Sequence, residues 1–135
     1  IGGAFYRGAD GALLVYDTTD FSTFSQVELW RRELLQRVDG PEAFPIVCVG
    51  NKMDLPCPTR DQDEKAAEAW CAAHGVGLLF ASACDGTGVA VAMEAVAALA
   101  LENKKRRQAL GVTKPPSLSL DDLHAREKRG SSNCC

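Results

Sequence analysis

The chain has 135 residues, of which 46% are hydrophobic and 24% are charged, and its formal net charge is −3. This length suits one domain, and the composition is ordinary for a globular protein. No apolar run approaches the ~20 residues that a bilayer-spanning helix needs, and residues 1–10 lack the basic flank of a signal peptide. A membrane-spanning chain is therefore not expected, and no nucleic-acid partner is predicted.

The cysteines favour a cytosolic, reducing compartment. The sequence contains no CxxC pair, and His74 and His124 are not spaced as zinc ligands. Four cysteines lie inside or beside apolar segments, namely Cys48, Cys57, Cys71 and Cys84. A reduced thiol in such a place behaves as a small hydrophobic group, so we expect these side chains to be buried.

Three short apolar runs predict parallel strands that are covered on both faces. They span residues 12–16, 46–49 and 78–81, and turn residues bound each of them. Helical patterns alternate with the runs, which predicts an α/β fold with a parallel sheet. From about residue 111 the pattern gives way to Pro, Ser, Gly and mixed charges, which is typical of a flexible tail. The predicted organisation is one domain over residues 1–110 and a tail over residues 111–135.

Each of the three helical patterns has an expected apolar stripe and expected ends. The stripes are Phe24, Val27, Trp30, Leu34 and Val38, then Ala66, Ala69, Trp70 and Ala73, then Met93, Val96, Ala97 and Ala100. The expected ends are Asp20 or Ser22 as an N-cap, a Thr59–Gln62 capping box, Gly75 as a stop and Gly88 as a start. The basic residues 104–107 suit the negative end of the last helix dipole.

The first loop with candidate chemistry is Gly-Asn-Lys-Met-Asp at residues 50–54, directly after the second strand. Ligands bind at this edge of a parallel sheet. The carboxylate of Asp54 can accept two parallel N–H bonds, which guanine offers at N1 and N2 and adenine does not. Each is worth roughly 1.5–3 kcal/mol when it is charge-assisted. Asn51 can donate to a ring acceptor or tie the loop to its neighbours, and the stem of Lys52 can lie across a purine face. The alternative for the tetrapeptide is a plain surface turn.

The second loop is Ala-Ser-Ala-Cys at residues 81–84, after the last strand. Its small residues let backbone N–H groups approach a ligand, and the N–H of Ala83 is expected to donate to a carbonyl such as guanine O6. Ser82 also fits a simple strand-end turn. Cys84 fits a core thiol better than a nucleophile, because no positioned base is evident. Asp17, at the end of the first strand, is interpreted as a cap or a loop tether.

These loops carry a family resemblance. Residues 51–54 resemble the NKxD guanine-specificity motif of small GTPases, and Ser82-Ala83 resembles the core of their SAK motif. Residues 5–10 and 15–17 resemble the Rab family, while residues 30–35 and 69–71 are most similar to its late-endosomal branch. The similarity spans roughly residues 1–105.

The resemblance implies a three-layer parallel sheet of the P-loop small GTPase type and a GTP/GDP switch in vesicle and endosomal traffic. Effectors, exchange factors and GTPase-activating proteins would be its partners. The implied guanine contacts come from Asn51, Lys52, Asp54, Ser82, Ala83 and Cys84. Because the family usually has Lys where this chain has Cys84, weaker base contacts are expected.

The sequence has no GxxxxGK[ST] segment and no Gly-Lys dipeptide. A phosphate cradle needs the backbone N–H groups and the lysine of that segment. The family's Mg²⁺-binding Thr and water-orienting Gln are not matched either. The resemblance therefore predicts a truncated Rab that lacks the N-terminal strands and phosphate loop and has no catalytic residue here. The alternative is a membrane-tethered interaction module that does not hydrolyse GTP.

The sequence ends in Cys134 and Cys135 on a polar leader, a pattern that differs from C-a-a-X. It resembles the double-cysteine ending of Rabs, to which a geranylgeranyl transferase and an escort protein bring two prenyl groups. Two lipid chains anchor stably where one binds marginally. The implied location is the cytoplasmic face of late endosomes, lysosomes or vacuoles, in exchange with the cytosol. An unmodified tail and an intermolecular disulfide are the alternatives.

Overall fold

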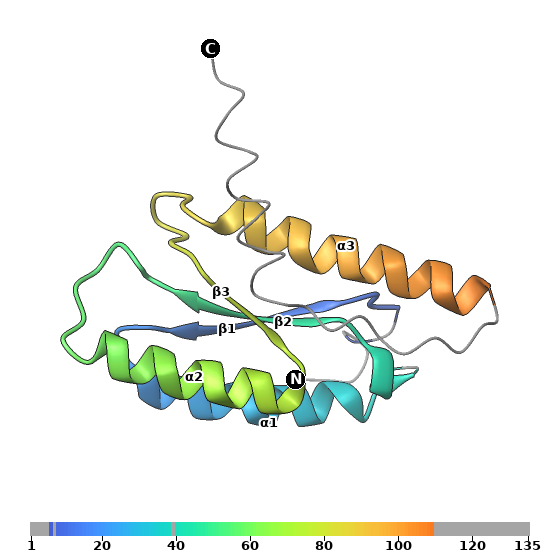
Figure 1. The fold of residues 1–135 in the computed structure, drawn as a ribbon, viewed down its shortest axis with the longest axis horizontal. Coiled ribbons are helices and arrows are strands. Elements are labelled where there is room, and N and C mark those ends of the chain that lie inside the picture. The colour runs from blue at the N-terminus through green and yellow to red at the C-terminus, as the bar shows by residue number, and fades with distance from the viewer. Residues whose placement is uncertain (1–5, 7, 39, 110–135) are drawn as a thin grey trace, which may run out of the picture.

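The computed structural model describes residue 6, residues 8–38 and residues 40–109, which form three layers (Figure 1). The middle layer is a sheet of three parallel strands in the order β1-β2-β3. The strands are β1 (Ala12–Asp17), β2 (Ile46–Asn51) and β3 (Gly77–Phe80). This confirms the predicted α/β fold and parallel sheet, and each strand lies within two residues of its expected bounds.

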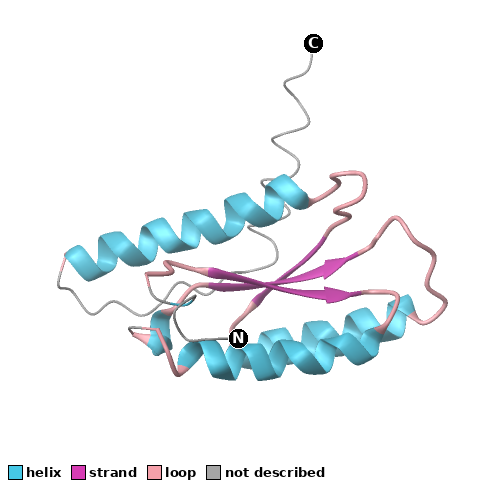
Figure 2. Cartoon of the chain, turned by 180° about the vertical axis from the view of Figure 1, so that it is seen from behind, coloured by secondary structure: helices cyan, strands magenta, loops and turns pink. Residues whose placement is uncertain are grey.

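Helices cover both faces of the sheet, as Figure 2 shows from the opposite side. On one face lie α1 (Phe24–Leu35) and α2 (Arg60–His74), and on the other lies α3 (Val89–Gln108). Two short 3₁₀ turns, η2 (Phe21–Thr23) and η3 (Pro41–Ala43), precede α1 and β2. None of the helices among the described residues has the length and apolar character that crossing a membrane requires.

The core divides into two clusters because successive strand side chains point to opposite faces of the sheet. Toward α1 and α2 the strands contribute Leu14, Tyr16, Ile46, Cys48 and Leu78. Toward α3 they contribute Val47, Val49, Leu79 and the following Ala81. Covering both faces explains why β2 is a continuous apolar run with Val47 and Cys48 fully buried.

The expected helix ends are confirmed, including the start of α2 after Thr59, but the side-chain capping predicted at that start is not. Asp20 accepts a hydrogen bond from the N–H of Ser22 at 3.1 Å and caps the turn that leads into α1. Gly75 ends α2 in the left-handed region with φ 64°. The Thr59–Gln62 capping box is wrong, because the Thr59 hydroxyl donates to Oδ2 of Asp63 at 2.6 Å instead of capping a backbone N–H.

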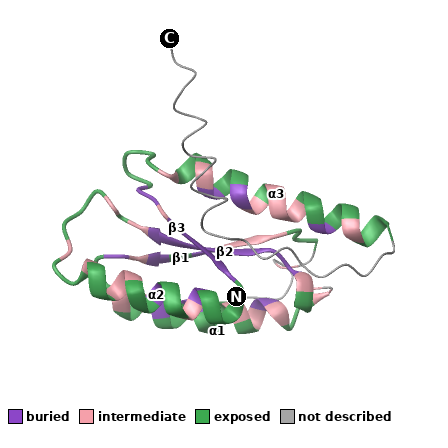
Figure 3. Cartoon of the chain, in the orientation of Figure 1, coloured by how far each residue is buried: buried purple, intermediate pink, exposed green. Residues whose placement is uncertain are grey.

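The buried faces of the helices agree only in part with the predicted stripes, since Trp70 and Val96 pack against the core but other predicted residues do not (Figure 3). Along α1, Phe24, Val27 and Leu34 are buried as expected, but Trp30 is exposed. Along α2 and α3 the buried apolar residues are Ala67 and Cys71, then Ala92 and Ala95. The predicted Ala66, Ala69, Ala73, Met93 and Ala97 are exposed. Alanine-rich helices offer several faces of similar hydrophobicity, so packing rather than the sequence pattern selects the face that is buried.

The expected burial of the cysteine side chains is confirmed at two of the four positions. Cys48 and Cys71 are buried, whereas Cys57 is half-buried and Cys84 is exposed. The interpretation of Cys84 as a core thiol is therefore wrong, because the loop that follows β3 leaves the core before this residue. Cys134, Cys135 and the predicted tail lie outside the described residues, so the domain boundary at residue 110 stays a prediction.

Candidate functional site

The loops that follow β2 and β3 are joined by direct hydrogen bonds. The N–H of Met53 donates to the carbonyl of Ala81 at 3.1 Å, and the N–H of Ala83 donates to Oδ1 of Asn51 at 2.9 Å. The loops meet because the carboxyl ends of two neighbouring parallel strands lie at the same edge of the sheet. Of the two roles expected for Asn51, the structure shows the tie between loops. The N–H of Ala83 is engaged in that tie, so a ligand carbonyl would have to share it.

Asp54 is held at this junction by Ser82. The Ser82 side chain is buried, and its hydroxyl donates to Oδ1 of Asp54 at 2.6 Å and accepts from the N–H of Asp85 at 3.3 Å. Asp54 itself is exposed, and no hydrogen bond to its Oδ2 is found among the described residues. One carboxylate oxygen is thus fixed, while the other is available as an acceptor at the surface of the loop.

Lys52 is fixed by a partner on a neighbouring strand. Its Nζ lies 2.6 Å from Oδ2 of Asp17, and its backbone has φ 70°, the left-handed region that non-glycine residues rarely adopt. Asp17 Oδ1 also accepts from the N–H and the hydroxyl of Thr19, at 2.8 and 2.6 Å. These hydrogen bonds, that from Lys52 foremost, lower the pKa of Asp17 to about 2, and the pairing raises the pKa of Lys52.

The expectation that Asp17 tethers a loop is confirmed, but the sequence did not identify Lys52 as its partner. Each residue lies at or just after the end of a predicted strand, but the sequence does not say which strands are neighbours in the sheet. The sheet register pairs Asp17 with Asn51, the residue next to Lys52, and this places the two side chains together.

The start of α3 packs closely against the end of β3, next to the loop that carries Ser82. Gly88 has φ 72°, and a Cβ there would lie 2.3 Å from the carbonyl oxygen of Phe80 at the end of β3. Only glycine allows both this conformation and this close approach. In the turn before it, Asp85 accepts from the N–H of Thr87 at 2.8 Å, and this hydrogen bond lowers the pKa of Asp85.

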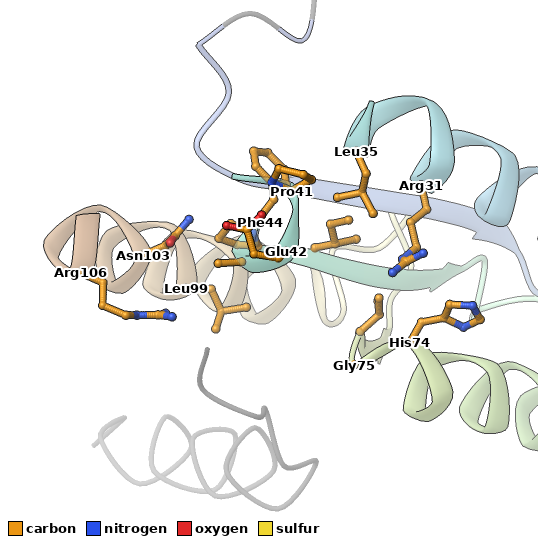
Figure 4. A pocket seen from close by; sticks show the side chains of 14 residues that line it. Arg31, Leu35, Pro41, Glu42, Phe44, His74, Gly75, Leu99, Asn103 and Arg106 are labelled. Atoms are coloured by element: carbon orange, nitrogen blue, oxygen red, sulfur yellow. The ribbon is translucent and has the colours of Figure 1, made fainter. Parts of the chain in front are cut away.

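A cavity of about 300 Å³ lies elsewhere, at the amino ends of β2 and β3 (Figure 4). Its lining includes Arg31, Phe44, His74, Leu99 and Arg106. Because the loops with Asp54 and Ser82 lie at the opposite ends of the same strands, the cavity is separate from them. Among the described residues no group of three or more His, Cys, Asp or Glu side chains is placed to hold a metal ion.

The chain matches known proteins along most of its length. The family model described as the Ras family matches residues 1–102. The chain is 34% identical over 138 residues to "Ras-related protein Rab-7a" of Paramecium octaurelia, an alignment that covers 100% of the chain and 65% of that protein. It is 35% identical over 139 residues to "Ras-related protein Rab7" of Cenchrus ciliaris, again covering 100% of the chain and 65% of the relative. The alignment to "Ras-related protein Rab7" of Pisum sativum is 39% identical over 112 residues and covers 80% of the chain and 54% of the relative.

The chain thus spans about two thirds or less of the length of these relatives. Its motifs, its parallel sheet and these matches agree with one another. The chain belongs to the Ras family of small GTPases and, within it, to the late-endosomal Rab branch that includes the Rab7 proteins.

Proposed function

We propose that this chain recognises the guanine base of GDP and GTP through the carboxylate of Asp54. The observation that carries the proposal is the hydrogen bond of 2.6 Å from Ser82 to Oδ1 of Asp54. It holds the carboxylate at the junction of two strand-end loops. A pre-oriented carboxylate there accepts from N1–H and N2–H of guanine and rejects adenine, which leaves it unpaired.

The neighbouring residues have supporting roles in this proposal. Asn51 keeps the two loops together through its bond to the N–H of Ala83, which would also face guanine O6. Lys52 would lay its stem along the purine, because its ammonium is anchored on Asp17. Cys84 is exposed on the second loop and would border the base without the cation that the family usually places there.

For the whole protein we propose a Rab-type switch that cycles between GDP and GTP in vesicle and endosomal membrane traffic. The family relationship supports this role, with effectors, exchange factors and GTPase-activating proteins as partners. Mg²⁺ in the whole protein would neutralise phosphate charge. The described residues do not fit the metal, and we assign no ligand for it here.

We further propose that Cys134 and Cys135 are prenylated by a geranylgeranyl transferase with its escort protein. Two prenyl chains would hold the protein on the cytoplasmic face of late endosomes or vacuoles, with a fraction returning to the cytosol. Support comes from the double-cysteine ending of the sequence and from the Rab7 relatives.

The test measures the affinities of the whole protein for GDP, ADP and xanthosine diphosphate, with and without Asp54→Asn. The wild-type protein should prefer GDP. Asp54→Asn should weaken GDP binding about 10²-fold or more, because two charge-assisted hydrogen bonds of roughly 1.5–3 kcal/mol each are lost or weakened. The same change should strengthen xanthosine diphosphate binding, because the new amide donates to the C2 carbonyl of xanthine.

The matched control is Asp61→Asn. Asp61 is an acidic residue in the first turn of α2, and its replacement should leave all three affinities unchanged. An unchanged GDP affinity in Asp54→Asn would overturn the proposed role of this carboxylate.

A further inference from the structure

Arg60, the first residue of α2, turns back onto the loop that carries Asp54. Its Nη1 lies 3.5 Å from the carbonyl oxygen of Met53 and 2.7 Å from the Met53 sulfur. Its Nη2 donates to the carbonyl oxygen of Leu55. Met53 and Leu55 are the two neighbours of Asp54 in the chain, so one planar guanidinium contacts the backbone on both sides of the proposed guanine-binding carboxylate.

The position of Arg60 calls for an explanation, because a cation at the amino end of a helix opposes the helix dipole. Acidic side chains are close by in the same turn, at Asp61 and Asp63. Nevertheless, Arg60 makes no ion pair within 4 Å among the described residues, and its hydrogen bonds go to the Met53–Leu55 backbone and to the Met53 sulfur. The guanidinium therefore makes its direct contacts with the loop, while its charge acts on Glu64, one turn along α2, only at longer range.

Asp54 and its two neighbours in the chain are thus held by several hydrogen bonds. Ser82 holds its side chain, and the bond from the N–H of Met53 to Ala81 holds the preceding residue against β3. Arg60 fixes the carbonyls on either side. On the Leu55 side, the N–H of Leu55 donates to the carbonyl of Lys52 at 3.1 Å and closes the turn, and the rigid donor fork of Arg60 adds a second restraint at the Leu55 carbonyl.

We infer that Arg60 is a positioning residue for guanine recognition, a role that rests on the function proposed for Asp54. It sets the distance of the Asp54 carboxylate from the exocyclic N2 amine without touching the base. Arg60→Gln leaves the carbonyls of Met53 and Leu55 without their shared donor. Arg60→Lys keeps the charge but can reach only one of the two carbonyls well.

The experiment compares the affinities of the whole protein for GDP and inosine diphosphate, which lacks the N2 amine. Arg60→Gln should reduce the ratio of the two affinities about tenfold, as expected when one charge-assisted hydrogen bond is lost. Arg60→Lys should fall between Arg60→Gln and the wild type. Arg32→Gln is the control, because Arg32 is exposed on α1 and pairs there with Glu28, and it should leave the ratio unchanged.

The thermal midpoint of each variant is measured alongside. A merely structural Arg60 would weaken both nucleotides equally as the midpoint falls, and an unchanged ratio in Arg60→Gln overturns the inference. If that variant does not fold, the ratio in Arg60→Lys decides in the same way. Failure of the proposed function looks different: the wild type would then show no preference for GDP, and Asp54→Asn would change nothing.

Discussion

Replacing Ser82 by alanine removes the hydroxyl that joins the two loops of the proposed guanine site. Two hydrogen bonds are lost, the bond of 2.6 Å to Oδ1 of Asp54 and the bond of 3.3 Å from the N–H of Asp85. Ser82 is only 1% exposed, so water has little access to the space that the hydroxyl leaves. The carboxylate of Asp54, in contrast, is exposed and regains water as a partner.

These two facts set the size of the effect. A hydrogen bond to a buried charge is worth about 1.5–3 kcal/mol, but the exposure of Asp54 brings the Ser82–Asp54 bond to about 1 kcal/mol. The longer bond from Asp85 adds about 0.5 kcal/mol at the low end of the ordinary range. Ser82→Ala should therefore lower the free energy of unfolding by about 1–2 kcal/mol.

A double-mutant cycle isolates the bond between the loops. Urea unfolding is followed for Ser82→Ala, Asp54→Ala and the pair, and the coupling free energy should be about 1 kcal/mol. Ser82→Ala combined with Glu28→Ala, on the exposed side of α1, should be additive within about 0.5 kcal/mol. A Ser82–Asp54 coupling no larger than in this control pair would show that the hydroxyl does not hold the carboxylate, and the site would lose its main support.

Two further predictions concern the surroundings of the site. Because the pKa of Asp17 is lowered from 3.8 to about 2, its contribution to stability is complete above pH 4 and is lost as the pH falls toward 2. Asp17→Asn should therefore lower the free energy of unfolding at pH 7, and its difference from wild type should shrink between pH 4 and pH 2 in urea titrations; a constant difference contradicts the pairing with Lys52. Gly88→Ala should cost about 2–4 kcal/mol, because the new methyl meets the Phe80 carbonyl in a left-handed conformation. Gly75→Ala, also left-handed but with nothing within 4 Å, should cost only about 1 kcal/mol, and equal thermal midpoints for the two variants would refute the close approach.

The strands and the polar loops that follow them were predictable from local patterns. The run from Ile46 to Val49 is apolar without interruption, which occurs when both faces of a strand are covered, and the structure confirms this. Asn51 and Asp54 follow that run directly, and Ser82 follows the next one, so strand ends and polar loops could be assigned together. Parallel pairing then requires the two loops to meet at one edge, as their hydrogen bonds show.

The buried faces of α2 and α3 were not predictable in the same way. In α3, small or apolar residues occur at nearly every position from Val89 to Leu101, so a stripe through Met93 and Ala97 looks as good as one through Ala92 and Ala95. The choice depends on how the helix sits on Val47, Val49 and Leu79, which lie far away in the sequence. Cys84 was misplaced for a related reason, because its distance from the core depends on the path of the loop after β3.

The sequence by itself determined the elements, their alternation and the residue types at the strand ends, because each of these follows from contacts between near neighbours along the chain. The tertiary structure alone decided the pairing of Lys52 with Asp17, the contacts of Arg60 with the loop around Asp54 and the helix faces that are buried. Those features depend on which segments come together in space and on the directions of their side chains. Local propensity carries no information about either, and only packing supplies it.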